Sequence, residues 1–469
     1  MNNDLIKKNN KDLTLHLAND LINVSKNGLS ENDIIQVEHL VLDYLGVCLR
    51  GGTMPWSKSL KEWGSRTKGS GISPVFGGGY STVPSIAALI NATAAHGMEL
   101  DDTHDTSVSH PGAVVISVAF AVGSTTGSSS RSIANAIALG YETIGRIGRA
   151  TRADKIIEHG FHPTALFGGF AATSTAGLLL NLNAEKLTRA WGLMLSMAGG
   201  SMQFSEDPLG TTVKRLHAGY GAHNGILAAE FASLGIDGPS QAFDGRYGLC
   251  NIFGFEPLLE ALTKNSDDEL EIHKISMKPY PCCRLFHSTI DALREVTDDF
   301  SINPSEIKEI RVGGPSIMVS QHMMRRPNSV MAAQYSLPYT MGASIIYGPT
   351  EYSAYESCNL GNNNILKIAD KVHAYNDKSL DEAFPEHFGS WVELDSIGNS
   401  TRRVEVLDSF GTPSNPMPES AIIQKLGSLI TPLDTQLTAE KISHYLKHFF
   451  SNQHSPVLEF ANCFTEEIN

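Results

Sequence analysis

Charged side chains are scarce in this chain. Asp, Glu, Lys and Arg make up 18% of its 469 residues, whereas globular proteins usually contain about 25%. Much of the chain must therefore lie in a large core or in an interface between subunits. The net charge is −14, which argues against non-specific binding to nucleic acid or to an anionic membrane. An anionic small molecule could still bind where basic side chains converge.

Long apolar runs and targeting signals are also lacking. The sequence has no run of 18 apolar residues, so we expect no membrane-spanning segment. The first ten residues, MNNDLIKKNN, show neither the apolar core of a signal peptide nor an arginine-rich amphipathic pattern. The six cysteines are few and scattered, as is typical of a reducing compartment. These features predict a cytoplasmic protein.

Signatures of common cofactor and nucleophile sites are missing as well. We find no Gly-x-Gly-x-x-Gly after a strand and no P-loop pattern, which argues against dinucleotide and nucleotide binding. No Gly-x-Ser-x-Gly marks a serine nucleophile. No motif around Cys282 and Cys283 marks an activated thiolate, and adjacent cysteines suit an iron–sulfur cluster poorly. Covalent nucleophilic catalysis is therefore not expected.

One short segment is rich in residue types that can ligate a metal ion. Five of its side chains could ligate one ion by type: Asp101, Asp102, His104, Asp105 and His110. Their spacing matches no standard metal signature. We therefore expect neither a metal nor an organic cofactor.

Helical patterns dominate the first 260 residues. Ser30, followed by acids, predicts the N-cap of a helix that runs through Val47 and stops at Gly51–Gly52. Further helices are expected over 83–95, 113–122, 132–147, 163–182, 184–197 and 218–234. Several of them consist largely of Ala, Gly, Ser and Leu, and such small residues let buried helix axes approach closely. This pattern predicts the interior of an all-helical domain.

The pattern changes near residue 265. Residues 268–277 (DELEIHKISM) and 306–314 (EIKEIRVGG) show the alternation typical of strands. A helix is expected over 330–347, and a hairpin over 390–410 that turns at Gly398–Asn399. After Gly411, helices are expected over 421–430 and 439–450. We therefore predict a mainly α protein with a smaller α+β domain. Its parts are a helical domain (1–267), an inserted α+β lid domain (268–408) and a helical completion (409–469).

Five polar segments punctuated by Gly or Pro interrupt the apolar pattern. They are HGMELDDTHDTSVSHPG (96–112), EHGFHP (158–163), GTTVKRLHAG (210–219), KPYPCCRLFH (278–287) and QYSLPYTMG (334–342). Each alone has an ordinary explanation, since acids before a helix act as caps and proline often starts a helix. Five together, in an apolar helical scaffold, predict one shared cleft.

The residue types in these segments indicate acid–base chemistry beside an anion. Four side chains can exchange protons with a substrate: Asp101, Asp102, His110 and His162. Four can hold carboxylates: Lys214, Arg215, Lys278 and Arg284. Helix N-termini after His162 and at His217 would add N–H donors for an anion. This combination suits proton abstraction, elimination of water or loss of CO2 beside a carboxylate.

The order of these motifs resembles the MmgE/PrpD family. HGMELDDTH, HPGAVV, GFHPTA, GTTVKRLHAG and KPYPCCRLFH follow the order of the family, and DSFGTPSNPMPES resembles its C-terminal stretch. The match runs from about Asp33 to Ile430. The resemblance implies a large helical domain completed by the C-terminal helices, with a smaller α+β lid. It also implies a homodimer that needs no metal or organic cofactor.

The resemblance and the residue types together predict roles for individual residues. The expected catalytic residues are Asp101, Asp102, His110, His162, Lys214 and Tyr339. The expected substrate-binding residues are His104, His217, Lys278, Tyr280, Arg284 and His287. In this scheme the lysines bind carboxylates, and one histidine moves a proton while an aspartate orients it. Tyr339 or the second histidine protonates the departing group.

The family includes 2-methylcitrate dehydratases, cis-aconitate decarboxylases and iminodisuccinate epimerases, whose reactions all make or quench a carbanion beside a carboxylate. We therefore expect a cofactor-independent lyase acting on a small di- or tricarboxylate, with 2-methylcitrate-like dehydration as the leading reaction. Decarboxylation and epimerisation are alternatives, because LDDTH and HPG depart from the Asn-Asp pair and HPSDN-like segment of the dehydratases. An alternative of another class is a non-catalytic carboxylate-binding helical protein. The low charge and the Ala/Gly-rich helices also predict a homodimer with an apolar interface.

Overall fold

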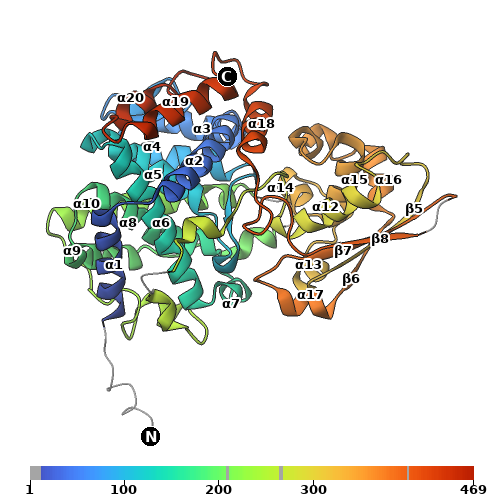
Figure 1. The fold of residues 1–469 in the computed structure, drawn as a ribbon, viewed down its shortest axis with the longest axis horizontal. Helices are drawn as coiled ribbons and strands as arrows, with labels where there is room; N and C mark the ends of the chain where they lie inside the picture. The colour runs from blue at the N-terminus through green and yellow to red at the C-terminus, as the bar shows by residue number, and fades with distance from the viewer. Residues whose placement is uncertain (1–11, 208–210, 264–267, 399–400, 469) are drawn as a thin grey trace, which may run out of the picture.

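Two assemblies of secondary structure lie side by side in the chain, a large helical one and a smaller α+β one (Figure 1). The computed structural model describes residues 12–207, 211–263, 268–398 and 401–468. Both ends of the chain contribute to the helical assembly, where the blue and red segments of Figure 1 lie together. The yellow-to-orange middle segment forms the second assembly. The predicted fold class, mainly α with a smaller α+β part, is therefore confirmed.

The helices that the sequence predicted in the first assembly lie close to their predicted ranges, and five further helices occur among its described residues. The capping box between Ser30 and Asp33 starts the second helix as predicted. The helices are α1 (Leu13–Asn27), α2 (Glu31–Gly51), α3 (Pro55–Gly64), α4 (Pro84–His96), α5 (Pro111–Thr126), α6 (Ser130–Thr151), α7 (Ala153–Glu158), α8 (Pro163–Leu179), α9 (Ala184–Leu195), α10 (Val213–Ser233), α11 (Leu249–Ile252), α18 (Glu419–Ile430), α19 (Ala439–Ser451) and α20 (Val457–Asn462). Strands β1 (Ser73–Val75) and β2 (Tyr80–Thr82) form a short antiparallel pair.

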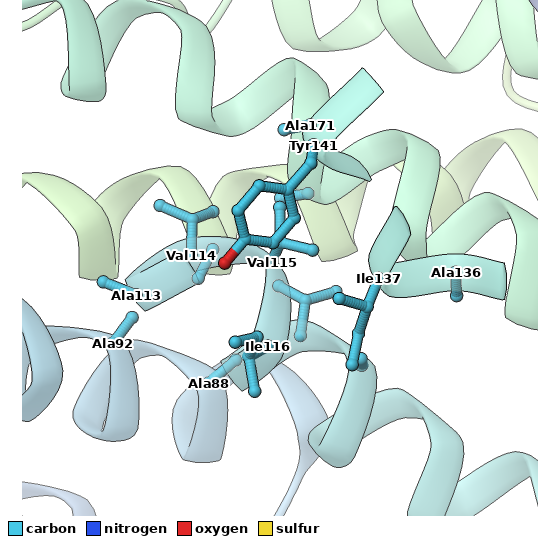
Figure 2. Close-up of a cluster of buried hydrophobic side chains, with 14 of the residues drawn as sticks. Ala88, Ala92, Ala113, Val114, Val115, Ile116, Ala136, Ile137, Tyr141 and Ala171 are labelled. Carbon is cyan, nitrogen blue, oxygen red and sulfur yellow. The ribbon is translucent and has the colours of Figure 1, made fainter. Parts of the chain in front are cut away.

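Small side chains let the central helices pack closely. Figure 2 shows alanines of α4, α5 and α8 in one buried cluster with Tyr141 of α6. Gly219 of α10 lies so near α4 that a Cβ there would come within 2.3 Å of Thr93 Oγ1 and 2.7 Å of the Leu89 carbonyl. Helices α5 and α8 are buried along almost their whole lengths. This rigid interior carries the polar segments at its helix ends.

The second assembly is built on a four-stranded sheet. Its strands are β5 (Ile307–Gly314), β6 (Val372–Asn376), β7 (Ser390–Ser396) and β8 (Arg402–Val406). Their order is β6–β5–β7–β8, with β5 and β6 parallel and the other pairs antiparallel. The helices are α12 (His287–Val296), α13 (Ser316–Gln321), α14 (Val330–Gln334), α15 (Leu337–Tyr347), α16 (Asn363–Ala369) and α17 (Lys378–Ala383). The predicted hairpin is β7–β8, and Asn399 of its predicted turn lies outside the described residues.

Two sequence predictions need correction. The predicted strand over 268–277 is reduced to β4 (Ile275–Ser276), which pairs with β3 (Thr103–His104) of the helical assembly. Residues 271–274 form a 3-10 turn instead. Ile272 and Ile275 both enter the first core. Side chains three apart share a face on a helical turn, whereas a strand would point them to opposite faces.

The predicted helix over 330–347 is split into α14 and α15. Pro338 has no N–H to bond the carbonyl of Gln334 four residues earlier, so the first helix cannot continue. Ser336 then caps the new helix by accepting a hydrogen bond from the Tyr339 N–H at 3.1 Å. The break leaves Tyr335 between the two helices, where its hydroxyl contacts Glu99.

Two large hydrophobic cores and one small cluster form among the described residues, and the small cluster joins Tyr352 to residues of the helical assembly such as Val47 and Leu100. The first contains buried residues up to Met277 and resumes at Met417, whereas the second runs from Tyr280 to Leu394. The change of core therefore falls between Met277 and Tyr280. The predicted boundary at residue 267 lies outside the described residues. Among the residues that the structure describes, no helix is both long and apolar enough to cross a bilayer.

Candidate active site

Glu99 lies between two lysines where the two assemblies meet. Its carboxylate forms ion pairs with Lys214 Nζ and, at 3.6 Å, with Lys278 Nζ. It also accepts a hydrogen bond from Tyr335 OH at 3.1 Å. Burial disfavours the charged form, but the two lysines outweigh it and hold the pKa of Glu99 well below its usual range. Glu99 is therefore an ionised internal partner of both lysines.

The backbone at Glu99 is held in an unusual conformation. Its φ is 57°, in the left-handed region that side chains other than glycine seldom adopt. The Glu99 carbonyl accepts a hydrogen bond from Lys278 Nζ at 2.9 Å, and the Met98 carbonyl accepts one from Gln334 Nε2 at 2.9 Å. Such a conformation costs about 1–3 kcal/mol and persists only where the surroundings impose it. Here Lys278 and Gln334 supply that constraint through their hydrogen bonds to this backbone.

Asp101 contacts two histidines. The Nδ1 atom of His96, the last residue of α4, lies 2.7 Å from Asp101 Oδ2. His110 Nδ1 lies 3.5 Å from Asp101 Oδ1 and 2.9 Å from the carbonyl of Asp102. Within the described part of the chain, His96 Nε2 is buried without a hydrogen-bond partner. Asp101 thus orients two imidazoles, one of which has a ring nitrogen free for another ligand.

A second pair of histidines continues this row. His162 Nδ1 lies 3.0 Å from His217 Nδ1, and the His96 and His162 ring centroids are 5.9 Å apart. Burial lowers the pKa of His110 and of His217 to about 3. Burial, and next the charge of Lys214, hold the pKa values of His96 and His162 well below the usual range. All four imidazoles are therefore neutral at neutral pH and able to accept a proton.

Helix starts hold this row in place. His110 precedes Pro111 at the start of α5, and His162 precedes Pro163 at the start of α8. Proline at the first helical position fixes the backbone where each helix begins. The positive end of a helix dipole also disfavours an imidazolium ion. The two His-Pro motifs therefore both place the imidazoles and keep them neutral.

Asp102 has a different environment from Asp101. It accepts hydrogen bonds from Tyr141 OH at 2.6 Å and from the Gly112 N–H at 2.9 Å, and so it caps α5. Burial raises the pKa of Asp102 to about 7. Of the two acids predicted from the sequence, only Asp101 has its carboxylate against histidines, whereas Asp102 supports the helix.

Several other predicted site residues have partners elsewhere. His104 pairs with Glu271 at 2.9 Å, and Tyr280 OH donates to Asp291. Arg284 pairs with Asp105 at 2.9 Å, which joins the second assembly to the first. The Tyr339 hydroxyl is 2.8 Å from the Ala354 carbonyl and 2.9 Å from the Asn359 carbonyl. His287 packs on the Tyr280 ring, with 5.2 Å between the ring centroids. These five side chains are engaged with other partners, and Tyr335 rather than Tyr339 contacts the Glu99 carboxylate.

Comparisons with known proteins identify the family of this chain. The MmgE/PrpD N-terminal domain matches residues 16–260, and the MmgE/PrpD C-terminal domain matches residues 280–447. The chain belongs to the MmgE/PrpD family. The cis-aconitate decarboxylase of Aspergillus terreus is 23% identical over 465 residues, covering 94% of each chain. The cis-aconitate decarboxylase of Homo sapiens is 24% identical over 375 residues, covering 77% of this chain and 76% of the human protein. A third relative, the cis-aconitate decarboxylase-like protein oryM of Aspergillus oryzae, is 25% identical over 392 residues.

Three residues of this MmgE/PrpD site were missed by the sequence prediction: His96, Glu99 and Tyr335. All three lie inside segments already marked as polar, at 96–112 and 334–342. His96 had one available signal, since it ends an apolar helix and lies five residues before Asp101. The other two had none, because their contacts join residues far apart in the sequence.

One group in the site has the residue types of a metal centre. His96, Asp101 and His110 each offer a ligand atom, and these atoms lie within 4.8 Å of one another. Burial is the main cause of the low pKa of His96, and the charges of Lys214 and Lys278 lower it further. A metal cation would meet the same repulsion. The electrostatics therefore fit an anion better, with the two lysines as its binding groups.

Proposed function

We propose that this chain is a cofactor-independent lyase that acts beside a carboxylate of a small di- or tricarboxylic acid. The observation that carries the proposal is the placement of Lys214 and Lys278 against the row of neutral imidazoles. Ammonium groups can bind a substrate carboxylate and stabilise charge that develops beside it. The imidazoles can move a proton at the neighbouring carbon. The cis-aconitate decarboxylases among the relatives support the same chemistry.

In the proposed mechanism, a substrate carboxylate replaces Glu99 as the partner of one or both lysines. Decarboxylation of cis-aconitate would break one carbon–carbon bond and release CO2. The electron pair would enter the allylic system beside a retained carboxylate, where the lysines stabilise it. One proton, taken from water and relayed through His110 or the His162–His217 pair, would complete itaconate. Asp101 would orient His96 and His110 during this transfer.

Dehydration, the leading prediction from the sequence, is the second candidate. It needs the same carbanion-like state, reached by proton removal rather than by loss of CO2, followed by departure of hydroxide as water. The decarboxylase relatives favour the first reaction, although identities of 23–25% support the shared step better than the product. Epimerisation of an amino-dicarboxylate would use proton removal and return alone.

Proton NMR in D2O distinguishes these outcomes. The EDTA-treated protein would be mixed separately with cis-aconitate, 2-methylcitrate, citrate and iminodisuccinate. We expect itaconate signals from cis-aconitate. A new vinylic signal from a hydroxy acid would assign dehydration instead, and deuterium exchange without a new product would assign epimerisation. No turnover in any tube, with carboxylate binding retained, would replace the proposal with the non-catalytic alternative.

Lys214→Ala tests the residue assignment. We expect kcat/KM to fall at least about 100-fold, as when a group that stabilises transition-state charge is removed. Lys186→Ala, an exposed lysine on α9, is the matched control and should keep wild-type activity. Circular dichroism and thermal unfolding would confirm that both variants fold. Wild-type turnover by folded Lys214→Ala would contradict the assignment.

We further propose that the protein is a cytoplasmic homodimer. Its six cysteines are free thiols, which agrees with a reducing compartment. Large apolar side chains are exposed along one stretch of the helical assembly: Leu234, Ile236, Tyr247, Ile252, Phe255 and Leu258. A second copy could cover them. Light scattering should give about twice the chain mass at micromolar concentration, and a monomer there would contradict the proposal.

A further inference from the structure

Three consecutive carbonyls of the site segment are held by side chains from distant parts of the chain. Gln334 Nε2 donates to the Met98 carbonyl at 2.9 Å, and Lys278 Nζ donates to the Glu99 carbonyl at 2.9 Å. The third donor, Lys425 Nζ, lies 2.8 Å from the Leu100 carbonyl. The first two come from the middle of the chain, whereas Lys425 comes from the C-terminal return. Residues 98–100 are therefore held both by the middle part of the chain and by its C-terminal part.

Lys425 is placed for this contact by a buried ion pair. It lies on α18, which packs against α2. Its Nζ pairs with Asp43 Oδ1 of α2 at 2.6 Å, and the two side chains are 8% and 2% exposed. Lys425 carries the charge that balances this buried carboxylate. The ion pair holds the ammonium group within hydrogen-bond distance of the carbonyl of Leu100, the residue between Glu99 and Asp101.

A small pocket lined in part by Asp43, Asp101 and Asp102 lies beside the Lys425–Asp43 pair. Asp101 Oδ1, which faces His110 at 3.5 Å, makes no hydrogen bond within the described part of the chain. Asp101 Oδ2 lies 2.7 Å from His96 Nδ1. The hydrogen bonds to the three preceding carbonyls therefore hold the backbone that carries this side chain.

We propose that Lys425 is a positioning residue, which fixes the Leu100 peptide so that Glu99 meets the lysines and Asp101 meets the histidines. This inference rests on the proposed function, since it assigns the C-terminal helix a part in the same site. Lys425 acts through the backbone and touches no reacting atom. Displacement of a catalytic group by about 1 Å can cost about 100-fold in rate. Loss of Lys425 should therefore lower kcat rather than substrate binding by Lys214.

Four variants separate positioning from stability. Lys425→Met should lower kcat by about 10- to 100-fold while KM changes less than about 3-fold. Asp43→Asn keeps the donor to Leu100 and an amide oxygen that can still accept from Lys425, so kcat should fall less than in Lys425→Met. The double variant removes both charges, so it should regain much of the stability lost in Lys425→Met but not its kcat. Lys447→Met, which breaks an exposed ion pair with Glu419, is the matched control and should leave kcat unchanged.

Hydrogen–deuterium exchange gives a readout that does not require turnover. Amides of residues 97–104 should exchange faster in Lys425→Met than in the wild type or in Lys447→Met. Wild-type kcat in folded Lys425→Met, recovery of kcat in the double variant, or unchanged exchange would each overturn the inference. If the wild type turns over none of the acids, the proposed function fails, and the exchange experiment still decides whether Lys425 holds the segment.

Discussion

Burial of individual site histidines makes the stability of the folded chain sensitive to acid. His110 and His217 have a pKa of about 3 in the folded chain, against an ordinary value of 6.5. Between these values the unfolded chain binds more protons than the folded chain. The stabilisation is therefore fully present above about pH 6.5 and is lost as the pH falls toward 3. Each such histidine contributes at most about 1.4 kcal/mol per pH unit to this loss.

His217→Asn tests this linkage at the residue scale. The free energy of unfolding should fall less steeply between pH 6.5 and 5 in the variant than in the wild type, because one depressed titration has been removed. Urea denaturation at several pH values measures the slope. His444→Asn replaces an exposed histidine and should keep the wild-type slope. An unchanged slope in His217→Asn would contradict the assigned neutral state of this imidazole.

Single residues also mark how far the sequence prediction reached. Asp101, His110, His162, Lys214 and Lys278 were predicted at the site and lie in it. Motif order is a property of the chain, so it could be read directly. Tyr335 and Tyr339 are four residues apart in the same segment, 334–342, and the sequence could not rank them. Only the break between α14 and α15 turns Tyr335 toward Glu99.

At the scale of elements, α4 and α10 are in close contact at a glycine, Gly219. In Gly219→Ala the new Cβ would come within 2.3 Å of Thr93 Oγ1 and 2.7 Å of a backbone carbonyl. The helices would have to move apart, and overpacking of this kind costs about 1–3 kcal/mol. Since α10 carries Lys214 and His217, activity should fall together with stability.

Urea denaturation followed by circular dichroism measures this effect. Gly361→Ala is the control, because a Cβ there would meet no atom within 4 Å. Its unfolding midpoint should match that of the wild type. A Gly219→Ala midpoint equal to that of the control would show that α4 and α10 have more room than the structure indicates.

At the scale of the whole molecule, Arg284 joins the two assemblies. Its guanidinium pairs with Asp105 at 2.9 Å and bonds Ser409 Oγ at 3.1 Å. Arg284→Met would leave Asp105 without its cation in a largely buried place. Removal of one partner of a buried pair costs on the order of 3 kcal/mol. We therefore expect a lower melting temperature and weaker coupling between the two cores.

Differential scanning calorimetry measures both effects. Arg326→Met removes a pair with Asp370 that is similarly short, at 2.7 Å, but half exposed. Exposed pairs contribute about 0–1 kcal/mol, so this control should melt close to the wild type. Equal melting temperatures for the two variants would show that Arg284 does not couple the assemblies.

Sequence alone determined the family, the mainly helical fold and most residues of the site. These follow from motif order, from helical periodicity and from His-Pro helix starts, which are all local properties. Only the tertiary structure decided which side chains of the site contact one another. Glu99 contacts Lys214, which is 115 positions away in the sequence, and Tyr335, which is 236 positions away. Its neighbour Leu100 contacts Lys425, which is 325 positions away. Such contacts depend on how two cores and a returning C-terminal helix pack, and no local pattern encodes that geometry.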